Sequence, residues 1–422
     1  MASAARRAAI DAGRLWQDLM ALAAITEPER PYTRRSFSPL FDAGRLAIRG
    51  WLLQAGLEVT VDFAGNLIGR LPGRDPARGT IAIGSHSDTV PGGGRFDGIA
   101  GVAAAIEIAR AFASSGERLH HDLAVIDFLA EEPSDFGLSC IGSRGMTGML
   151  EPAMLALADR SGRRLSEALI GVGGDPLRLE AARRSDIAAF FELHIEQGPV
   201  LEDEGLDLGL VTGIVGIRRI EVRFTGQAAH AGTAPMHLRR DAAYAGALLI
   251  AAVREEAERL AAAGEGYFVA TVGIVEVRPG GSNVVPRECR LVIDARSSDP
   301  ALANAFAGAI EAASHAVAAR AGVERSAFET LSDGLPALCD PGLRGYLRAS
   351  ADRLGFSARE MASGAGHDAA FMARICPSAM LFIPCLKGMS HTPDEWAEPD
   401  ALAKGAAVLL EAVRSFDAAA AG

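Results

Sequence analysis

Histidine and carboxylate side chains stand at the ends of several short apolar segments of this sequence. One apolar run ends in His86, with Asp88 two residues later, and another (121–132) ends in Glu131 and Glu132. A histidine followed by a nearby carboxylate can supply a metal ligand together with the group that orients it. Adjacent carboxylates at a strand end point in different directions, so one can bind a metal while its neighbour faces a bound water. These four residues indicate a hydrolytic metal site.

Three further residues extend this set. Asp97 lies in a glycine-rich loop, and glycine lets a loop turn sharply enough to bring a carboxylate close to a metal. His194 and His391 follow two other strand-like segments. A lone histidine is more often a hydrogen-bonded structural residue, and a lone Glu-Glu pair is usually a solvated strand end. Together, however, the imidazoles and carboxylates form a mixed nitrogen and oxygen ligand set that suits a pair of divalent ions.

Alternating strands and helices position these residues in the first half of the chain. Strands at 79–86, 121–132 and 188–198 contain most of the residues named above, and an alanine-rich helix is predicted at 99–114. Such alternation is typical of an open sheet with helices on both faces. Ligands bind at the carboxyl ends of the strands in that architecture, so we expect one site along that edge of the sheet.

The character of the sequence changes near residue 215. The next segments are predicted in the order β-α-β-β-α-β, which is the ferredoxin-like order. The strands are expected at 216–227, 266–279, 289–297 and about 325–330, and the helices at 239–263 and 300–321. Alternation then resumes with a helix at 341–355, a strand at 378–385 and a last helix at 399–417.

The predicted fold is therefore α/β, with a discontinuous di-metal catalytic domain whose mixed sheet is flanked by helices. A ferredoxin-like α+β domain is inserted into it. We assign residues 1–214 and 331–422 to the catalytic domain and 215–330 to the insertion.

Composition excludes several classes of function. The 422 residues are 49% hydrophobic and 23% charged, which is typical of a globular chain with two or three domains. The net charge of −11 is spread along the chain without a basic block, so no nucleic acid partner is expected. No stretch reaches the ~18 apolar residues of a membrane span, so no membrane partner is expected either.

Two features bear on the compartment. The first 22 residues read as an amphipathic helix interrupted by Arg and Asp rather than as a signal peptide. The five cysteines are scattered and form no CxxC pair, which favours reduced thiols in a core. The expected location is the cytoplasm.

Longer motifs resemble a known family. The ordered set of His, Asp and Glu residues described above resembles the M20 metallopeptidase and aminoacylase superfamily. Five runs resemble its hydantoinase/carbamoylase amidase branch: HIEQGPVLE (194–202), GQAAHAGTAPMHLRRDA (226–242), GSNVVP (281–286), SGAGHDA (363–369) and FIPCLKGMSHTPDE (382–395). The resemblance spans nearly the whole chain, and the motifs keep their order. That branch contains N-carbamoyl-L-amino acid hydrolases, allantoate amidohydrolases and β-ureidopropionases.

The resemblance implies two divalent metal ions per subunit, of zinc, manganese, cobalt or nickel. His86 and His194 match the terminal ligands of one ion, and Glu132 and His391 match those of the other. Asp97 matches the carboxylate that bridges the two ions.

The resemblance also implies the catalytic groups. Glu131 matches the general base that takes a proton from water, and Asp88 matches the residue that orients His86. His230 matches a histidine that reaches into the partner subunit and stabilises the tetrahedral oxyanion, so the inserted domain is expected to form a homodimer and to act as a lid.

Substrate contacts are implied at further positions. Asn283 and Arg296 match residues that hold the substrate carboxylate, for which the planar fork of arginine is suited. Gln197 matches a polar residue near the substrate, and His367 lies in a family motif without an assigned role.

The expected reaction is hydrolysis of the ureido C–N bond of an N-carbamoyl-L-amino acid to the amino acid, carbon dioxide and ammonia. Allantoate, a ureidoglycine-like compound, β-ureidopropionate and N-acyl amino acids are alternative substrates, and a catalytically silent metal-binding protein is the alternative of a different class. The segment Pro133–Asp135 departs from the branch, because Asp135 stands where a positive charge is common. We expect this loop to affect substrate preference or metal affinity.

Overall fold

The chain folds into two compact units. The structure is a computed structural model that describes residues 7–419. Residues 1–6, in the predicted amphipathic N-terminal stretch, and residues 420–422 lie outside the described residues. The first unit ends at Thr212 and resumes at Leu338, and the second comprises Gly213–Ala337.

A mixed sheet organises the first unit. Its strand order is β1-β2-β4-β3-β5-β15-β6-β13, and β14 pairs with β6. The central strands β4, β3, β5 and β15 are parallel, whereas β1, β2 and β6 pair antiparallel with their neighbours. The strands are β1 (Glu58–Val61), β2 (Leu67–Leu71), β3 (Thr80–His86), β4 (Asp122–Phe128), β5 (Ile187–Ile195), β6 (Leu208–Ile214), β13 (Ala337–Leu338), β14 (Ala358–Ser363) and β15 (Ser378–Ile383).

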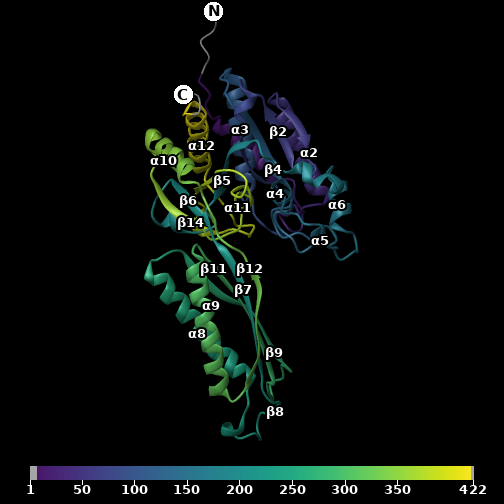
Figure 1. Ribbon diagram of the computed structural model, residues 1–422, viewed down its shortest axis with the longest axis vertical. Helices are drawn as coiled ribbons and strands as arrows, with labels where there is room; N and C mark the ends of the chain where they lie inside the picture. The colour runs from purple at the N-terminus through teal and green to yellow at the C-terminus, as the bar shows by residue number, and fades with distance from the viewer. Residues whose placement is uncertain (1–6, 420–422) are drawn as a thin grey trace, which may run out of the picture. The chain divides into compact units, whose positions relative to one another are not determined.

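Helices cover this sheet (Figure 1). Helix α3 packs against β3, β4 and β5, and α12 packs against β5 and β15, while α4 and α11 contact each other. The helices of this unit are α1 (Ala12–Ala23), α2 (Pro39–Gln54), α3 (Ile99–Ser115), α4 (Ile141–Thr147), α5 (Pro152–Leu155), α6 (Leu165–Gly171), α7 (Val200–Asp203), α10 (Pro341–Leu354), α11 (Ala369–Met372) and α12 (Pro399–Ala419). Short 3-10 turns occur at Pro76–Arg78, Pro176–Ala182 and Leu386–Gly388.

The alternation of side chains along β5 separates the core from the polar residues. Ala189, Phe191, Leu193 and Ile195 belong to the main hydrophobic cluster with α3 and α12. The intervening positions, which include His194, point to the other face of the strand because successive side chains alternate. Glu192 and His194 are therefore held at fixed positions by a strand whose other face is well packed.

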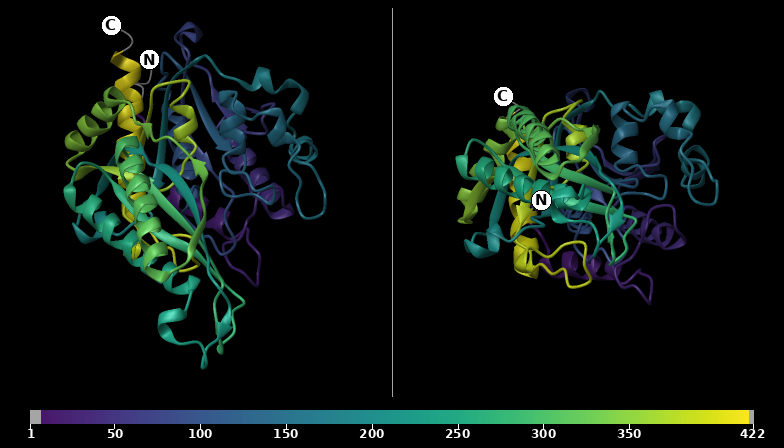
Figure 2. Two further views of the ribbon diagram at one scale, coloured as in Figure 1. Left: turned by 60° about the horizontal axis from the view of Figure 1, so that its bottom comes forward. Right: turned by 90° about the horizontal axis from the view of Figure 1, so that it is seen from below.

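The second unit is a four-stranded antiparallel sheet with two helices on it. The strand order is β12-β7-β11-β9, and α8 and α9 pack against each other and against the sheet. Figure 2 shows these two helices along the same face of the sheet. The main elements are β7 (Gly216–Thr225), α8 (Ala242–Ala263), β9 (Phe268–Arg278), β11 (Glu288–Ser297), α9 (Pro300–Ala321) and β12 (Glu324–Asp333). A short ribbon of β8 (Ala229–His230) with β10 (Val284–Val285) and a 3-10 turn, Met236–Leu238, complete the unit.

The predicted fold class and the order β-α-β-β-α-β are confirmed, and several boundaries differ. Strand β4 ends at Phe128, not at Glu132, because Ala130 has a left-handed backbone (φ 52°) that breaks the extended run. Helix α8 begins at Ala242 because the side chain of Asp241 caps it. Strands β1, β2, β6 and β14 were not predicted. No helix within residues 7–419 combines the length and apolar character that crossing a membrane requires.

Candidate metal centre and active site

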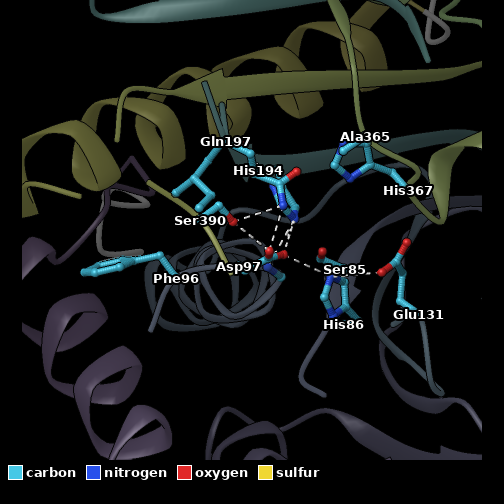
Figure 3. Close-up of polar contacts among 12 residues, drawn as sticks. Ser85, His86, Phe96, Asp97, Glu131, His194, Gln197, Ala365, His367 and Ser390 are labelled. Atoms are coloured by element: carbon cyan, nitrogen blue, oxygen red, sulfur yellow. Dashed lines mark hydrogen bonds and ion pairs between the residues drawn. The ribbon is translucent and has the colours of Figure 1, made fainter. Parts of the chain in front are cut away.

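Asp97 lies at the centre of the predicted ligands, and Figure 3 shows its contacts with His86 and His194. Its Oδ1 atom is 3.1 Å from Nε2 of His194 and 3.6 Å from Nε2 of His86. Its Oδ2 atom is 3.1 Å from Nε2 of His391, which is 3.2 Å from Oε1 of Glu132. The ligand atoms of His86, Asp97 and His194 lie within 4.8 Å of one another, and so do those of Asp97, Glu132 and His391. The five residues therefore form two adjacent groups that share one carboxylate.

Hydrogen bonds hold the rings of His86 and His194 so that Nε2 of each is available to bind a metal. Nδ1 of His86 lies 3.0 Å from the carbonyl oxygen of Asp88, and Nδ1 of His194 lies 2.9 Å from that of Ile195. A carbonyl oxygen only accepts, so in each neutral ring Nδ1 carries the hydrogen and Nε2 keeps its lone pair. Both Nε2 atoms face Asp97. This arrangement is typical of metal-ligating histidines, whose other nitrogen donates to a backbone carbonyl.

Asp88 positions the segment that follows β4. Its Oδ1 and Oδ2 atoms accept the backbone N–H groups of Glu131 (3.2 Å) and Glu132 (3.3 Å). Its Oδ1 also lies 3.6 Å from Nδ1 of His86. One buried carboxylate thus touches a histidine and both glutamates, which fixes their mutual position.

Glu131 lies beside the two groups without joining either. Its Oε2 atom is 3.6 Å from Nε2 of His86, and its side chain is buried. Burial raises the pKa of Glu131 well above its usual value, and the charges of Glu132 and Asp368 raise it further while His86 opposes them. A carboxylate in this position is within reach of a water or substrate held by the neighbouring ligands.

In the part of the chain that the structure describes, the carboxylates of the cluster have no arginine or lysine paired with them. Among the described residues, Asp88, Asp97, Glu131 and Glu132 form ion pairs only with histidines and never with lysine or arginine. Buried charges are normally paired or coordinate metals. The histidine Nε2 atoms that face Asp97, together with these carboxylates, form a ligand set that divalent cations fit.

The pKa directions have the same cause. Burial lowers the pKa of the His86 imidazole, but Glu131, Asp88 and Asp97 outweigh burial and raise it well above its usual value. Contacts with Asp97 and Glu132 raise the pKa of His391 to about 10. Burial alone raises the pKa of Asp97, yet the three histidines hold it well below its usual value.

At two positions in the loop before α3, neighbouring side chains lie so close to the backbone that only glycine fits. Gly98 has φ +67°, and a Cβ there would lie 2.5 Å from the His86 ring. The N–H of Gly98 also donates to Nε2 of His194 (3.1 Å). Gly94 has φ +112°, and a Cβ there would lie 2.3 Å from the carboxylate of Glu395. The prediction that glycines let this loop approach the site is consistent with both contacts.

Gln197 contacts Asp97 directly. Its Nε2 donates to Oδ2 of Asp97 (2.7 Å) and to Oγ of Ser390 (3.2 Å), as Figure 3 shows. Ser390 donates to the same Asp97 oxygen (3.1 Å) and to Glu395 (3.1 Å). Glu395 accepts the backbone N–H groups of Phe96 (2.6 Å) and Asp97 (3.1 Å). Hydrogen bonds thus hold both the side chain and the backbone of Asp97, the residue shared by the two groups of ligands.

Sequence reasoning missed several polar residues of this site, all of them buried except the half-buried Ser390. Glu395, Ser390, Glu192, Asp368 and Cys140 contact the predicted ligands or lie among them. Glu192 accepts from Ser85 (2.7 Å) and from the backbone N–H of Ala369 (3.2 Å). Asp368 and Glu395 are acidic residues inside the family motifs, so the sequence offered a reason to consider them as site residues. No motif or spacing offered such a reason for Cys140.

His367, which had no predicted role, is buried behind the ligands. Its ring lies 4.6 Å from that of His194, and its Nε2 is 2.8 Å from Oγ of Ser363. Burial lowers the pKa of His367 well below its usual value. A neutral imidazole at this place packs against a ligand ring without adding charge.

The predicted substrate residues of the second unit fall at opposite ends of its sheet. His230 pairs with Val284 in the β8–β10 ribbon, and the carbonyl of Asn283 accepts the N–H of Ala231 (2.9 Å). Arg296 lies near the far end of β11, where its Nε donates to Asp294 (2.8 Å). At roughly 3.3 Å per residue, β11 separates the two places by about 26 Å. Within one unit, Asn283 and Arg296 are therefore not brought together.

The atypical loop after Glu132 carries its own counter-charge. Asp135 forms an ion pair with Arg35 (2.7 Å), and both side chains are partly exposed. Phe136 of this loop stacks edge-on against Phe37 (5.4 Å). The negative charge that departs from the usual pattern is thus compensated by an arginine from another loop.

The chain belongs to Peptidase family M20/M25/M40, whose model matches residues 82–415. Within that family it is a member of the hydantoinase/carbamoylase amidase branch. It is 39% identical over 407 residues to an N-carbamoyl-L-amino acid amidohydrolase of Geobacillus stearothermophilus, covering 96% of this chain and 98% of that one. It is 36% identical over 412 residues to a ureidoglycolate hydrolase of Arabidopsis thaliana, covering 95% and 85%. A solved hydantoinase/carbamoylase family amidase from Burkholderia multivorans superposes with a TM-score of 0.90 at 35% identity, covering 97% of this chain and 98% of that one.

These findings confirm the predicted family, branch and class of enzyme. The protein is a metal-dependent amidohydrolase that acts on non-peptide C–N bonds of small ureido or amide substrates. Membership of the family implies divalent metals, and the clustered His, Asp and Glu residues are candidates for holding them.

Proposed function

We propose that this chain hydrolyses the ureido C–N bond of N-carbamoyl-L-amino acids. The observation that carries the substrate class is the likeness, over almost the whole of both chains, to an N-carbamoyl-L-amino acid amidohydrolase at 39% identity. The cluster around Asp97 supplies the chemistry that such a reaction needs.

Two divalent ions are proposed to occupy the two groups of ligands. His86, His194 and Asp97 hold one ion, and Glu132, His391 and Asp97 hold the other, which is the pairing that the distances favour. When bound, such ions supply a Lewis acid that polarises the scissile carbonyl and lowers the pKa of the attacking water. Zinc, manganese, cobalt and nickel all suit this nitrogen and oxygen set.

Glu131 moves the proton. It accepts a proton from the attacking water and delivers it to the leaving nitrogen, for which a buried carboxylate beside the ligand cluster is suited. The backbone carbonyl of Asp88 accepts from Nδ1 of His86, and its carboxylate accepts the backbone N–H of Glu131, so the base and a metal ligand keep a fixed separation. Gln197 is proposed to steady Asp97 as well as to face the substrate.

The substrate residues of the second unit are proposed to come from two subunits. Because β11 separates Asn283 from Arg296, both cannot contact one small carboxylate from the same chain. Arg296 pairs with Ile217 across the sheet, and its role of holding the substrate carboxylate stays a proposal from the family resemblance. His230 and Asn283 lie together and are assigned to the active site of the partner in a homodimer.

Ureidoglycolate is the second candidate substrate. The specific observation in its favour is the ureidoglycolate hydrolase that is 36% identical over 95% of this chain. Such a substrate carries the same ureido group and a carboxylate, so the same residues serve it.

The test is ammonia release from a substrate panel. Purified protein loaded with zinc, manganese or cobalt is assayed on N-carbamoyl-L- and D-amino acids, ureidoglycolate, allantoate, β-ureidopropionate and N-acetyl amino acids, with amino-acid detection for the last. Fast and L-selective turnover of the carbamoyl compounds is expected. The matched control is Glu131→Gln, which is isosteric, keeps the metal and should lose on the order of 10³-fold or more in kcat.

Other outcomes are equally informative. A kcat/KM for ureidoglycolate at least tenfold above that for every carbamoyl amino acid transfers the assignment to the second candidate. Substantial turnover by Glu131→Gln with full metal content contradicts the role of Glu131 as the base.

A further inference from the structure

We propose that Cys140 is a positioning residue for the catalytic base. Its thiol donates a hydrogen bond to Oε1 of Glu131 and thereby keeps Oε2 turned toward the ligand cluster. This inference rests on the proposed role of Glu131.

The two oxygens of Glu131 face different partners. The Sγ atom of Cys140 lies 3.4 Å from Oε1, whereas Oε2 lies 3.6 Å from Nε2 of His86. The same sulfur lies 3.7 Å from the backbone carbonyl oxygen of Glu131, so the nearer Oε1 is the favoured acceptor of its one hydrogen. Among the residues that the structure describes, no other group donates a hydrogen bond to this carboxylate. The thiol is therefore the contact that selects which oxygen faces the site.

The backbone fixes the thiol relative to the base. The N–H groups of residues 140, 141 and 142 donate to the carbonyls of residues 131, 130 and 129, at 2.9, 3.1 and 2.8 Å. Asn66 joins the same two segments, because its Oδ1 accepts the N–H of Leu129 (3.0 Å) and its Nδ2 donates to the carbonyl of Gly142 (3.0 Å). Motion of Cys140 away from Glu131 would require breaking this set of hydrogen bonds.

The backbone conformation indicates that the side chain itself is needed. Cys140 has a left-handed backbone (φ 55°, ψ 39°), a region that glycine adopts without strain and other residues adopt rarely. The position nevertheless carries a buried side chain whose sulfur reaches a carboxylate.

The other cysteines have no comparable partner. The sulfur of Cys376 donates to the carbonyl of Met372 (3.4 Å), and that of Cys385 donates to the carbonyl of Gly198 (3.7 Å). Cys289 is packed in the hydrophobic core of the second unit. Of the five cysteines, Cys140 is the one that is hydrogen-bonded to a carboxylate of the site.

Four variants separate positioning from simple core packing. Cys140→Ala and Cys140→Gly both remove the donor, and glycine also relieves the left-handed backbone. Cys140→Ser keeps a donor, and Cys289→Ala removes a buried thiol in the other unit. We expect kcat to fall about tenfold or more in the alanine and glycine variants at nearly unchanged KM and metal content, because misplacing a catalytic group by ~1 Å costs about a hundredfold. The serine variant should recover most of kcat, and Cys289→Ala should match the parent protein.

A spectroscopic signature tests the bond itself. The S–H stretching band of Cys140 is isolated by subtracting the infrared spectrum of Cys140→Ala from that of the parent protein. It is expected at lower frequency than the band of Cys289, obtained in the same way, because it donates to a carboxylate. Glu131→Gln should shift the band of Cys140 upward and leave that of Cys289 unchanged.

The outcomes distinguish this inference from the proposed function. If Glu131→Gln is inactive but Cys140→Gly keeps full kcat, the positioning role is wrong and the base assignment stands. If Glu131→Gln stays active, the base assignment fails whatever Cys140 does. If the glycine and serine variants lose kcat equally while their melting temperatures fall together, the thiol only fills space and the inference is overturned.

Discussion

The parallel strands β3, β4 and β5 carry acidic residues near both of their ends, and the two ends pair them differently. At the amino ends, Asp122 forms an ion pair with Arg70 (2.7 Å), and Asp186 accepts from Arg184 (2.6 Å). Asp186 also accepts from Thr80 at the start of β3 (2.8 Å). Each of these acids has a permanent cation beside it.

At the carboxyl ends the acids around Asp97 have histidines as partners, whereas Asp127, one residue before the end of β4, pairs with Arg45 (3.1 Å). His86, His194 and His391 surround Asp97, and two of them have Nδ1 placed against a backbone carbonyl. A histidine that binds a metal is a neutral imidazole, so in the metal-bound state these carboxylates take their counter-charge from the bound cations rather than from the protein. In the second unit, buried Glu221 resembles the acids at the amino ends, because Arg223 and Arg290 pair with it.

The partner of an acid indicates whether that acid holds the fold together or carries function. An acid paired with arginine is already satisfied and holds two chain segments together. An acid that faces metal-ligating histidines depends on a bound cation for its counter-charge. The kind of partner, rather than burial or position on a strand, distinguishes the two kinds of acid, since buried Asp127 lies near a carboxyl end and still pairs with arginine.

The largest expected effect comes from removing the shared carboxylate. Asp97→Asn takes away the one charge common to both groups of ligands. Bound metal should fall from about two ions per chain to one or fewer, and kcat should fall by on the order of 10³-fold. Metal is measured by plasma mass spectrometry and activity by ammonia release. Chelation of the parent protein should abolish activity, and zinc or manganese should restore it.

The matched control is the same Asp-to-Asn change at the amino ends of the parallel strands. Asp186→Asn should keep full metal content and activity within about twofold. Equal metal loss in both variants would mean that the histidine-paired end is not the metal site.

A smaller effect is expected on stability from Asp186. Its hydrogen bond with Arg184 lowers its pKa to about 2, below the usual 3.8. A lowered folded-state pKa stabilises the protein above the unfolded-state pKa and ceases to do so as pH falls through about 4 to 2. Because both side chains are partly exposed, screening limits the effect to about 1 kcal/mol or less, or about 1–3 °C.

Calorimetry of the parent and Asp186→Asn checks this sign. The variant should melt lower at pH 7, and the difference should shrink below about pH 4. A difference that stays constant down to pH 2.5 would show that the hydrogen bond to Thr80, not the charge, is responsible.

Much of the fold could be predicted from sequence because its core elements are long and strongly patterned. Helices α3, α8, α9, α10 and α12 were expected, as were the four main strands of the second unit. Of the missed strands, β1, β2 and β14 are short or partly exposed, as the half-buried Glu58–Val61 shows, so they have little apolar periodicity. Strand β6 is buried and as long as β3, so its omission has no such reason. The end of β4 was misplaced because a left-handed Ala130 has no sequence signature.

The site could be predicted where its residues form motifs. The five expected ligands lie together, but that geometry does not by itself establish their roles. Glu395 and Cys140 went unnoticed because their contribution is a contact with another residue of the site, which only the folded chain reveals. The separation of Asn283 from Arg296 also needed the structure, since it depends on the length of β11 between them.

The smallest effect is expected from Asp135, which follows the site in sequence but pairs with arginine. Its ion pair with Arg35 leaves the two side chains 60% and 31% exposed, so solvent screens it. A double-mutant cycle of Arg35→Ala and Asp135→Ala should give a coupling energy of roughly 0.2–1 kcal/mol by chemical denaturation. Metal content and kcat/KM should change less than about twofold. A tenfold fall in kcat/KM on only one substrate of the panel would instead make this loop a determinant of substrate preference. An acid close to the strand ends would then affect catalysis even though it is paired with an arginine.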